Sequence, residues 1–150
     1  MVLKHDFDNF PELTNAQMDE SYWESPHKQI LSDFKARCVK VHDGDTITVQ
    51  WDERDFTFPI RFLNVNAPEL SEGGRESQQW LEGQILNQEI EIKINPNNRV
   101  GRYGRLLGHV FFQGLNMGET MLHLGLTKEF ANRDEGKLPN LDKELKVVLE

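Results

Sequence analysis

Two runs of alternating hydrophobic and polar residues, separated by a short polar break, open the main body of the chain. Residues 34–51 read FKARCVKVHDGDTITVQW, with β-branched residues on both sides of the sequence HDGD. Because this alternation matches a half-buried strand and Asp-Gly favours a tight turn, the pattern predicts a β-hairpin. A third strand is expected over residues 56–65, and Pro68 shortly after it prevents the ladder from continuing.

Further along, the hydrophobic period changes between helical and strand-like values. Residues 71–86 contain good helix formers with Trp80, Leu81 and Ile85 near one side, whereas residues 90–94 and 106–112 alternate like strands. Residues 117–124 predict a second helix, closed by a glycine that suits a left-handed C-cap. The resulting order of five strands and two helices indicates an α+β fold that is mainly β.

Both ends of the chain read as additions to this body. Thr14 and Gln17 form a capping-box pattern that predicts a short helix, which Ser25 and Pro26 end. We therefore expect an acidic N-terminal extension over residues 1–33, the main, largely β domain over residues 34–136 and a short C-terminal helical segment over residues 137–150.

The composition of the chain excludes several classes of protein. The 150 residues, 37% of them hydrophobic, suffice for one core of ordinary size and are few for two domains. The formal net charge of -8 argues against a protein that coats nucleic acid by bulk electrostatics, so any phosphate contact must come from a local patch. Cys38 is the only cysteine, which rules out a disulfide within the chain. Since no apolar run has the length of a signal peptide or a membrane span, we expect a cytoplasmic protein without membrane contact.

Asp43 and Asp45 flank a glycine at the predicted hairpin turn. A sharp turn can direct two carboxylates to one cation, and ligation by oxygen alone suits Ca²⁺ or Mg²⁺. The alternative is that this is only a turn, since Asp and Gly are common turn residues.

Two more charged residues follow, in the predicted third strand and just after it. Arg61 lies in the apolar sequence FPIRFLNV, where an unpaired buried guanidinium would be costly, so it needs an anionic partner unless it faces outward. Its planar fork would suit phosphate oxygens. Glu69 comes where the strand meets its loop, either as a solvated acid or as a general base that orients water near a metal.

A basic stretch interrupts the acidic chain between the last two predicted strands. No acid occurs from residue 92 to residue 118, while Lys93, Arg99, Arg102, Tyr103 and Arg105 all do. Basic residues with an aromatic among them are expected where a protein contacts phosphates and stacks on bases. The alternative is a solvated basic loop that balances the acidic extension.

Together these features contain the groups that phosphodiester hydrolysis needs. A cation and two arginines would stabilise the charge that builds on phosphorus, and a glutamate would position or deprotonate water. The histidines have no ligand-like spacing, so we expect no zinc site.

Four segments, VKVHDGDTITV, IRFLNVNAPE, RYGRLLGHVF and MLHLGLTKEF, in this order resemble the staphylococcal nuclease (thermonuclease-like) family over residues 34–130. The resemblance implies a five-stranded OB-type β-barrel with two to three helices. It also implies a Ca²⁺-dependent endonuclease that hydrolyses phosphodiester bonds of DNA or RNA and leaves 3′-phosphates.

The same resemblance implies roles for individual residues. Arg61 and Arg105 would clamp the scissile phosphate, and Glu69 would act on the attacking water. Arg102 and Tyr103 would lie near a terminal phosphate of the bound nucleotide.

For the metal, the resemblance implies Asp45 as a carboxylate ligand, Asp43 beside it in the acidic pocket, and the carbonyl of Ala67. The family usually has a second aspartate where this chain has Asn66. An amide oxygen can ligate Ca²⁺ but adds no charge, so we expect a lower affinity or a changed preference for the ion.

Asn66 also supports an alternative function, a catalytically weakened OB-fold module that binds single-stranded nucleic acid or a protein partner. The acidic extension has three interpretations: a solubilising tail, a segment that docks a partner or a neighbouring chain, or a phosphate mimic that folds over the basic stretch.

Overall fold

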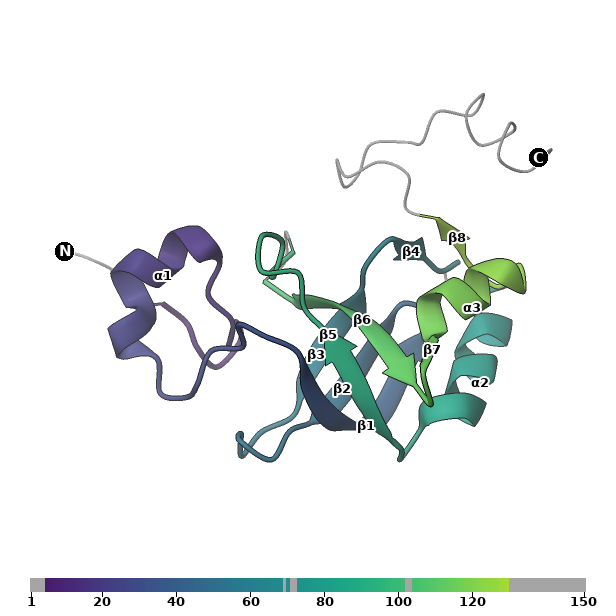
Figure 1. Ribbon diagram of the computed structural model, residues 1–150, viewed down its shortest axis with the longest axis horizontal. Helices are drawn as coiled ribbons and strands as arrows, with labels where there is room; N and C mark the ends of the chain where they lie inside the picture. Colours follow the sequence, from purple (N-terminus) through teal and green to yellow (C-terminus); the bar gives the residue numbers. More distant parts are fainter. Residues whose placement is uncertain (1–4, 69, 71–72, 102–103, 130–150) are drawn as a thin grey trace, which may run out of the picture.

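The computed structural model describes residues 5–68, 70, 73–101 and 104–129, which form a β-barrel with helices at its two ends (Figure 1). No helix in these residues is long and apolar enough to cross a membrane. The helical elements are α1 Asn15–Ser21, the 3₁₀ turn η1 Tyr22–Glu24, α2 Gly74–Ile85 and α3 Met117–His123. The strands are β1 Phe34–Asp43, β2 Thr46–Gln50, β3 Phe58–Phe62, β4 Val65–Asn66, β5 Glu89–Lys93, β6 Leu106–Phe112, β7 Leu115–Asn116 and β8 Lys128–Glu129.

Strands β1, β2, β3, β5 and β6 close into the barrel. The main sheet has the order β3-β2-β1-β5-β6-β7, and an additional parallel pairing brings β6 back to β3, with Ile60 opposite Leu106. β4 and β8 form a separate two-stranded ribbon. The fold is therefore α+β and mainly β, an OB-type five-stranded barrel with three α-helices in the described part of the chain, as the sequence predicts.

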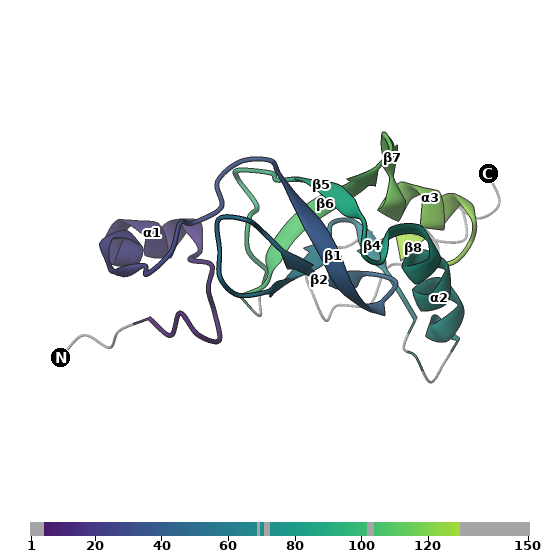
Figure 2. The same ribbon diagram turned by 90° about the horizontal axis from the view of Figure 1, so that it is seen from below.

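The inward-facing side chains of the strands fill the barrel. In β1, buried and exposed positions alternate through Phe34, Ala36 and Cys38, the period expected for a strand with one buried face. α2 and α3 lie at one end of the barrel (Figure 2) and add buried side chains such as Leu81 and Met121 to the core. Burial raises the pKa of the Cys38 thiol to about 11, so the thiol stays protonated and unreactive at neutral pH.

The predicted third strand is interrupted in the structure. It forms β3 and β4, separated by a turn in which Asn64 has a left-handed φ of 63°. Alternation alone did not predict this break or the two-residue strands β7 and β8, because such short elements contain too few positions to show a period. Residues 130–150, with the expected C-terminal helical segment, lie outside the described residues.

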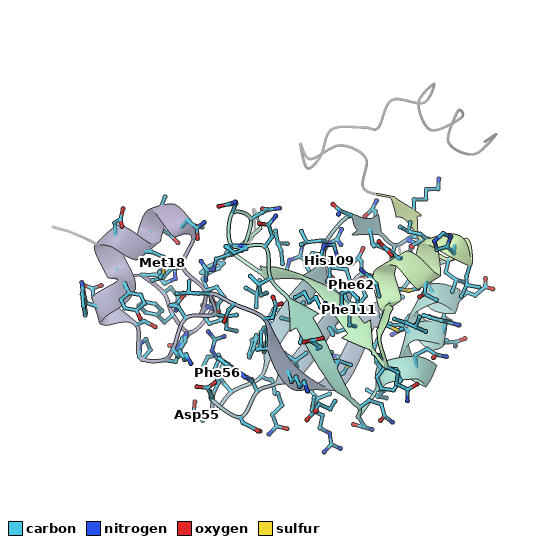
Figure 3. All side chains as sticks on the ribbon, in the orientation of Figure 1. Met18, Asp55, Phe56, Phe62, His109 and Phe111 are labelled. Atoms are coloured by element: carbon cyan, nitrogen blue, oxygen red, sulfur yellow. The ribbon has the colours of Figure 1, made fainter. Side chains whose placement is uncertain are left out.

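Residues 5–33, the N-terminal segment, lie at the end of the barrel opposite to α2 and α3 (Figures 1 and 2). α1 begins after Thr14, which forms the predicted capping box. Leu13 and Ile30 are buried, so the segment packs against the barrel and the solubilising-tail interpretation is wrong. Phe56 of the β2–β3 loop is labelled in Figure 3. His27 of the N-terminal segment packs edge-on against it, with 4.9 Å between the ring centroids.

The prediction that the basic stretch contacts phosphate is wrong for Arg99. This residue is only 3% exposed, and its Nη2 lies 3.3 Å from Oε2 of Glu12 in the N-terminal segment. A guanidinium enclosed in this way cannot reach a phosphate that arrives from solvent. The acidic segment therefore does contact the basic stretch, but through a buried structural ion pair.

Candidate active site

The turn between β1 and β2 carries two carboxylates at one end of the barrel. β1 ends at Asp43 and β2 begins at Thr46, and the ladder has an irregularity between Val41 and Asp43. The backbone N–H of Asp45 donates to Asp43 Oδ1 over 3.0 Å, a local bond typical of aspartate in turns. The structure thus holds both acids of the DGD sequence on one sharp turn, as predicted.

Gly44 lets this turn approach α2 and the segment after β4 very closely. A Cβ at Gly44 would lie 2.7 Å from Ser77 Oγ, 2.9 Å from Ser77 Cβ and 3.1 Å from Ala67 Cβ. Because a side chain has no room there, glycine sets the distance between the acidic turn and Ala67.

Gly44→Ala is expected to lower the free energy of unfolding by about 1–3 kcal/mol, the usual cost of forcing a methyl group into a packed site. Urea unfolding measures the effect. Most of it should disappear when the same change is made in a Ser77→Gly background, which removes the two closest contacts. An equal loss in both backgrounds would show that this contact is not the cause.

Asp45 connects the acidic turn to the strands around it. Its Oδ2 accepts a hydrogen bond from the backbone N–H of Ala67 over 2.8 Å and lies 3.6 Å from Arg61 Nη2. Its Oδ1 accepts from Thr46 Oγ1 over 2.8 Å. Its own carbonyl accepts from the N–H of Phe62 over 2.8 Å. The carboxylate is therefore buried with a fixed orientation.

Arg61 has the anionic partner that its apolar surroundings require, and this prediction is confirmed. Besides its ion pair with Asp45, its Nη1 donates to the carbonyls of Phe62 and Val65 over 2.8 and 2.7 Å. Its Nη2 also donates to Asn66 Oδ1 over 3.5 Å. Nε has no partner among the described residues, and both contacts of Nη2 are long, 3.5 and 3.6 Å, so the Nε side of the planar fork is the less engaged one.

The surroundings of Asp43 disfavour the ionised form of its carboxyl group. Burial, together with hydrogen bonding to Asp45 and its charge, raises the pKa of Asp43 to about 6, and Arg61 only partly opposes this. The carboxylates of Asp43 and Asp45 thus have the guanidinium of Arg61 as a shared positive charge in a partly buried site. Added positive charge would favour the ionised pair.

Asp43→Asn is expected to stabilise the metal-free protein by about 1 kcal/mol at pH 7, after discounting the pKa shift for partial exposure. The pKa of Asp43 is about 6 in the folded state and near 3.8 otherwise, so between these values the folded state binds more protons. Stability from this group is therefore lost as the pH rises from about 4 to about 6.

Urea unfolding in EDTA at pH 4 and pH 7 tests this pH dependence. The gain should be present at pH 7 and absent at pH 4, and Asp19→Asn, at an exposed site of α1, should show no such difference. A gain of equal size at both pH values would contradict the account.

Asn66 and Ala67 lie beside this cluster. Asn66 is exposed and pairs across the β4–β8 ribbon with Lys128, while Ala67 contributes its N–H to Asp45. Sequence reasoning missed Lys128 and Ser77, because no local pattern reveals contacts between distant parts of the chain.

Arg105 stands directly before β6, whose Leu107 pairs in parallel with Arg61. Alternate residues of an extended chain face the same side of a sheet. We therefore expect Arg105 to lie on the same side as Leu107 and its partner Arg61. Its side chain is partly buried. Three predicted site residues, Glu69, Arg102 and Tyr103, lie outside the described residues.

The donor atoms fit a hard divalent cation by type. Asp43, Asp45 and Asn66 supply oxygen only, which is the ligation that Ca²⁺ and Mg²⁺ prefer. Burial and the adjacent Asp45 carboxylate raise the pKa of Asp43 to about 6, so a cation between the two acids would favour the ionised form of both. Across the part of the chain that the structure describes, no group of three or more His, Cys, Asp or Glu side chains is placed to hold a metal. Any ion here therefore depends on amide, carbonyl or water oxygens as well.

Fold and site together define an OB-type barrel protein with an acidic turn and an arginine at its strand ends. Within this class, the chain belongs to the family of staphylococcal nuclease homologues, whose family model matches residues 59–147. This confirms the resemblance that the four sequence segments indicate.

Individual relatives are nucleases by name. The chain is 33% identical over 98 residues to an uncharacterized endonuclease of Escherichia coli O157:H7, and these residues cover 64% of this chain and 61% of the relative. It is 33% identical over 81 residues to a micrococcal nuclease of Shigella flexneri, covering 53% of this chain and 44% of the relative. For the endonuclease YncB of Bacillus subtilis the identity is 28% over 93 residues, covering 57% and 43%. The matched region thus spans about half of these relatives.

Proposed function

We propose that the chain is a metal-dependent endonuclease that hydrolyses phosphodiester bonds of DNA or RNA. The observation that carries the proposal is the Asp45–Arg61 pair, in which a buried carboxylate lies 3.6 Å from a guanidinium at the end of an OB-type barrel. Family membership and the nuclease names of the relatives support the same class of activity.

Arg61 is prepared to bind a phosphate. Two carbonyls hold its Nη1, and Nη2 makes only long contacts to Asp45 and Asn66, so the Nε side of the fork remains for a ligand. Parallel N–H groups of this kind match two phosphoryl oxygens. Because the side chain is already fixed, it loses little conformational entropy on binding. It can therefore stabilise the charge that develops on phosphorus in the transition state.

We assign the cation site to Asp43, Asp45, Asn66 and the carbonyl of Ala67, with Ca²⁺ as the expected ion. When bound, the ion supplies positive charge to a phosphoryl oxygen and acidifies a water molecule. Asp45 presents its carboxylate in one orientation because Thr46 and Ala67 donate to it. Asn66 adds an oxygen without charge, so the proposal includes a lower affinity than a site with a second aspartate would have.

In the proposed reaction Glu69 takes a proton from the attacking water. A new P–O bond forms, the P–O5′ bond breaks, and the 5′ oxygen takes a proton from solvent, to which Glu69 then releases its own. The products are a 3′-phosphate and a 5′-hydroxyl. Arg61 and Arg105 hold the phosphate that reacts, and Arg102 with Tyr103 binds a terminal phosphate of the nucleotide.

Analysis of product ends tests the metal requirement and the bond that breaks. Purified protein is incubated with 5′-labelled single-stranded DNA and RNA in Ca²⁺, in Mg²⁺ and in EDTA. We expect cleavage in Ca²⁺, none in EDTA, and fragments whose mobility a 3′-phosphatase changes. Cleavage that EDTA leaves intact would exclude the cation site, and 3′-hydroxyl ends would contradict the assigned bond.

The exposed Asn66 favours one second candidate, a barrel that binds single strands without cutting them. Asn66→Asp distinguishes the two, because it supplies the missing charge. If the natural chain is a nuclease, the variant should reach half-maximal activity at a lower Ca²⁺ concentration. Oligonucleotide binding without turnover in both proteins would favour the second candidate.

A further inference from the structure

The loop between β5 and β6 is described at residues 94–101, 104 and 105, and the side chain of Arg99 attaches it to the N-terminal segment. Its Nε donates to Ile30 O over 2.8 Å, and its Nη1 donates to Leu13 O and Asn15 Oδ1 over 2.9 and 3.0 Å. Its Nη2 forms the ion pair with Glu12. All four partners belong to residues 12–30, so this arginine connects the loop to that segment.

Glu12 is the centre of the attachment. It is 2% exposed and forms a second ion pair with Arg54 of the β2–β3 loop, whose guanidinium lies over the rings of Trp51 and Phe58. Burial lowers the pKa of Arg54 and of Arg99, and the charge of Glu12 opposes this in both. One carboxylate therefore compensates two buried guanidinium groups, and its loss would leave both without a counter-charge.

Two further contacts hold the loop on either side of Arg99. Before it, Asn15 Nδ2 donates to the carbonyl of Pro96 over 2.9 Å. After it, Gly104 has a φ of +76° and lies against Phe10 so closely that a Cβ would be 2.6 Å from Phe10 Cδ1. The contacts thus extend along the loop to the residue before Arg105.

We propose that residues 10–15 form a clamp that positions the β5–β6 loop, and with it Arg105, for binding the substrate strand. This rests on the proposed nuclease function, since it takes Arg105 to contact the phosphate. Glu12 and Asn15 are positioning residues, which act through the loop and do not touch substrate. A loop that is ordered beforehand loses less conformational entropy on binding, so the clamp lowers KM.

Steady-state cleavage by full-length Glu12→Gln protein, compared with Glu24→Gln, tests the clamp. Both variants lose one negative charge from the N-terminal segment, but Glu24 is exposed. Both variants are measured at a temperature where circular dichroism shows them folded. If the loop in Glu12→Gln occupies its binding position only about 10% of the time, KM for a single-stranded oligonucleotide should rise about tenfold. Its kcat should change less than about twofold, and Glu24→Gln should change neither constant. An unchanged KM in folded Glu12→Gln protein overturns the clamp.

Asn15→Ala is a milder variant that leaves no buried charge unpaired. It removes the hydrogen bonds to Pro96 and Arg99 and should raise KM about threefold, the effect of losing hydrogen bonds of ordinary net strength. An Asn15→Ala KM equal to that of the natural chain counts against the clamp.

Hydrogen exchange without substrate gives a reading that does not depend on activity. Amides of residues 97–101 should exchange faster in Glu12→Gln than in the natural chain, and Glu24→Gln should match the natural chain. If the natural chain does not cut nucleic acid, the proposed function fails while exchange still decides whether residues 10–15 order the loop. Unchanged exchange in Glu12→Gln overturns the clamp in either case.

Discussion

Arg61→Ala is expected to lower kcat/KM for nucleic acid cleavage by a factor on the order of 10³, the loss seen when a group that stabilises transition-state charge is removed. Arg61 is held in place by Asp45 and by two backbone carbonyls, so in the proposed reaction its fork would meet the phosphate without reorganisation. Arg61→Lys should lose most of the same activity, because an ammonium group keeps the charge but cannot form two parallel bonds.

The matched control is Arg37→Ala, which removes an exposed arginine six positions before Asp43 on the same strand as that acid. Its kcat/KM should stay within about twofold of the natural chain, because an exposed charge away from the site contributes little. Arg61→Ala also removes the hydrogen bonds to Phe62 and Val65, so rates are compared at a temperature where circular dichroism shows folded protein. Activity within about tenfold of the natural chain would refute the role given to Arg61.

Glu12→Gln should lower the free energy of unfolding by about 3–5 kcal/mol, the range for breaking a buried ion pair by removing one partner. The loss is large because Arg54 and Arg99 are both buried and depend on this one carboxylate. Chemical denaturation at pH 7 measures it.

Glu24→Gln serves as the control for stability and should stay within about 0.5 kcal/mol of the natural chain, as surface changes usually do. A double variant, Glu12→Gln with Arg99→Gln, should lose less than the sum of the two single changes, since the residues belong to one network. A loss below about 1 kcal/mol in Glu12→Gln would mean that the ion cluster is not buried in solution.

The sequence predicts those helices and strands whose formation depends on neighbouring residues in the chain. The hairpin of residues 34–51 follows from alternation and an Asp-Gly turn, and α3 is followed by Gly125 with a φ of 75°, as its position after the helix predicts. The break between β3 and β4 was not readable, because it depends on one asparagine in a left-handed conformation.

The sequence predicts only part of the candidate site. The cost of burying a guanidinium predicts that Arg61 has an anionic partner, and the structure identifies that partner as Asp45. This reasoning does not extend to Arg99, because the residue lies in a polar stretch of the sequence where burial is not expected. Its counter-charge, Glu12, is 87 positions away in the chain, and no local pattern records such a contact.

The most direct test of the central claim compares the natural chain with Glu69→Gln protein, purified in the same way, for cleavage of single-stranded DNA and RNA in Ca²⁺. Glutamine keeps the size of the side chain but cannot accept the proton from water, so the account predicts cleavage by the natural chain and a loss on the order of 10²-fold or more in the variant. Equal cleavage by the two proteins, or none by the natural chain in any metal, would contradict it.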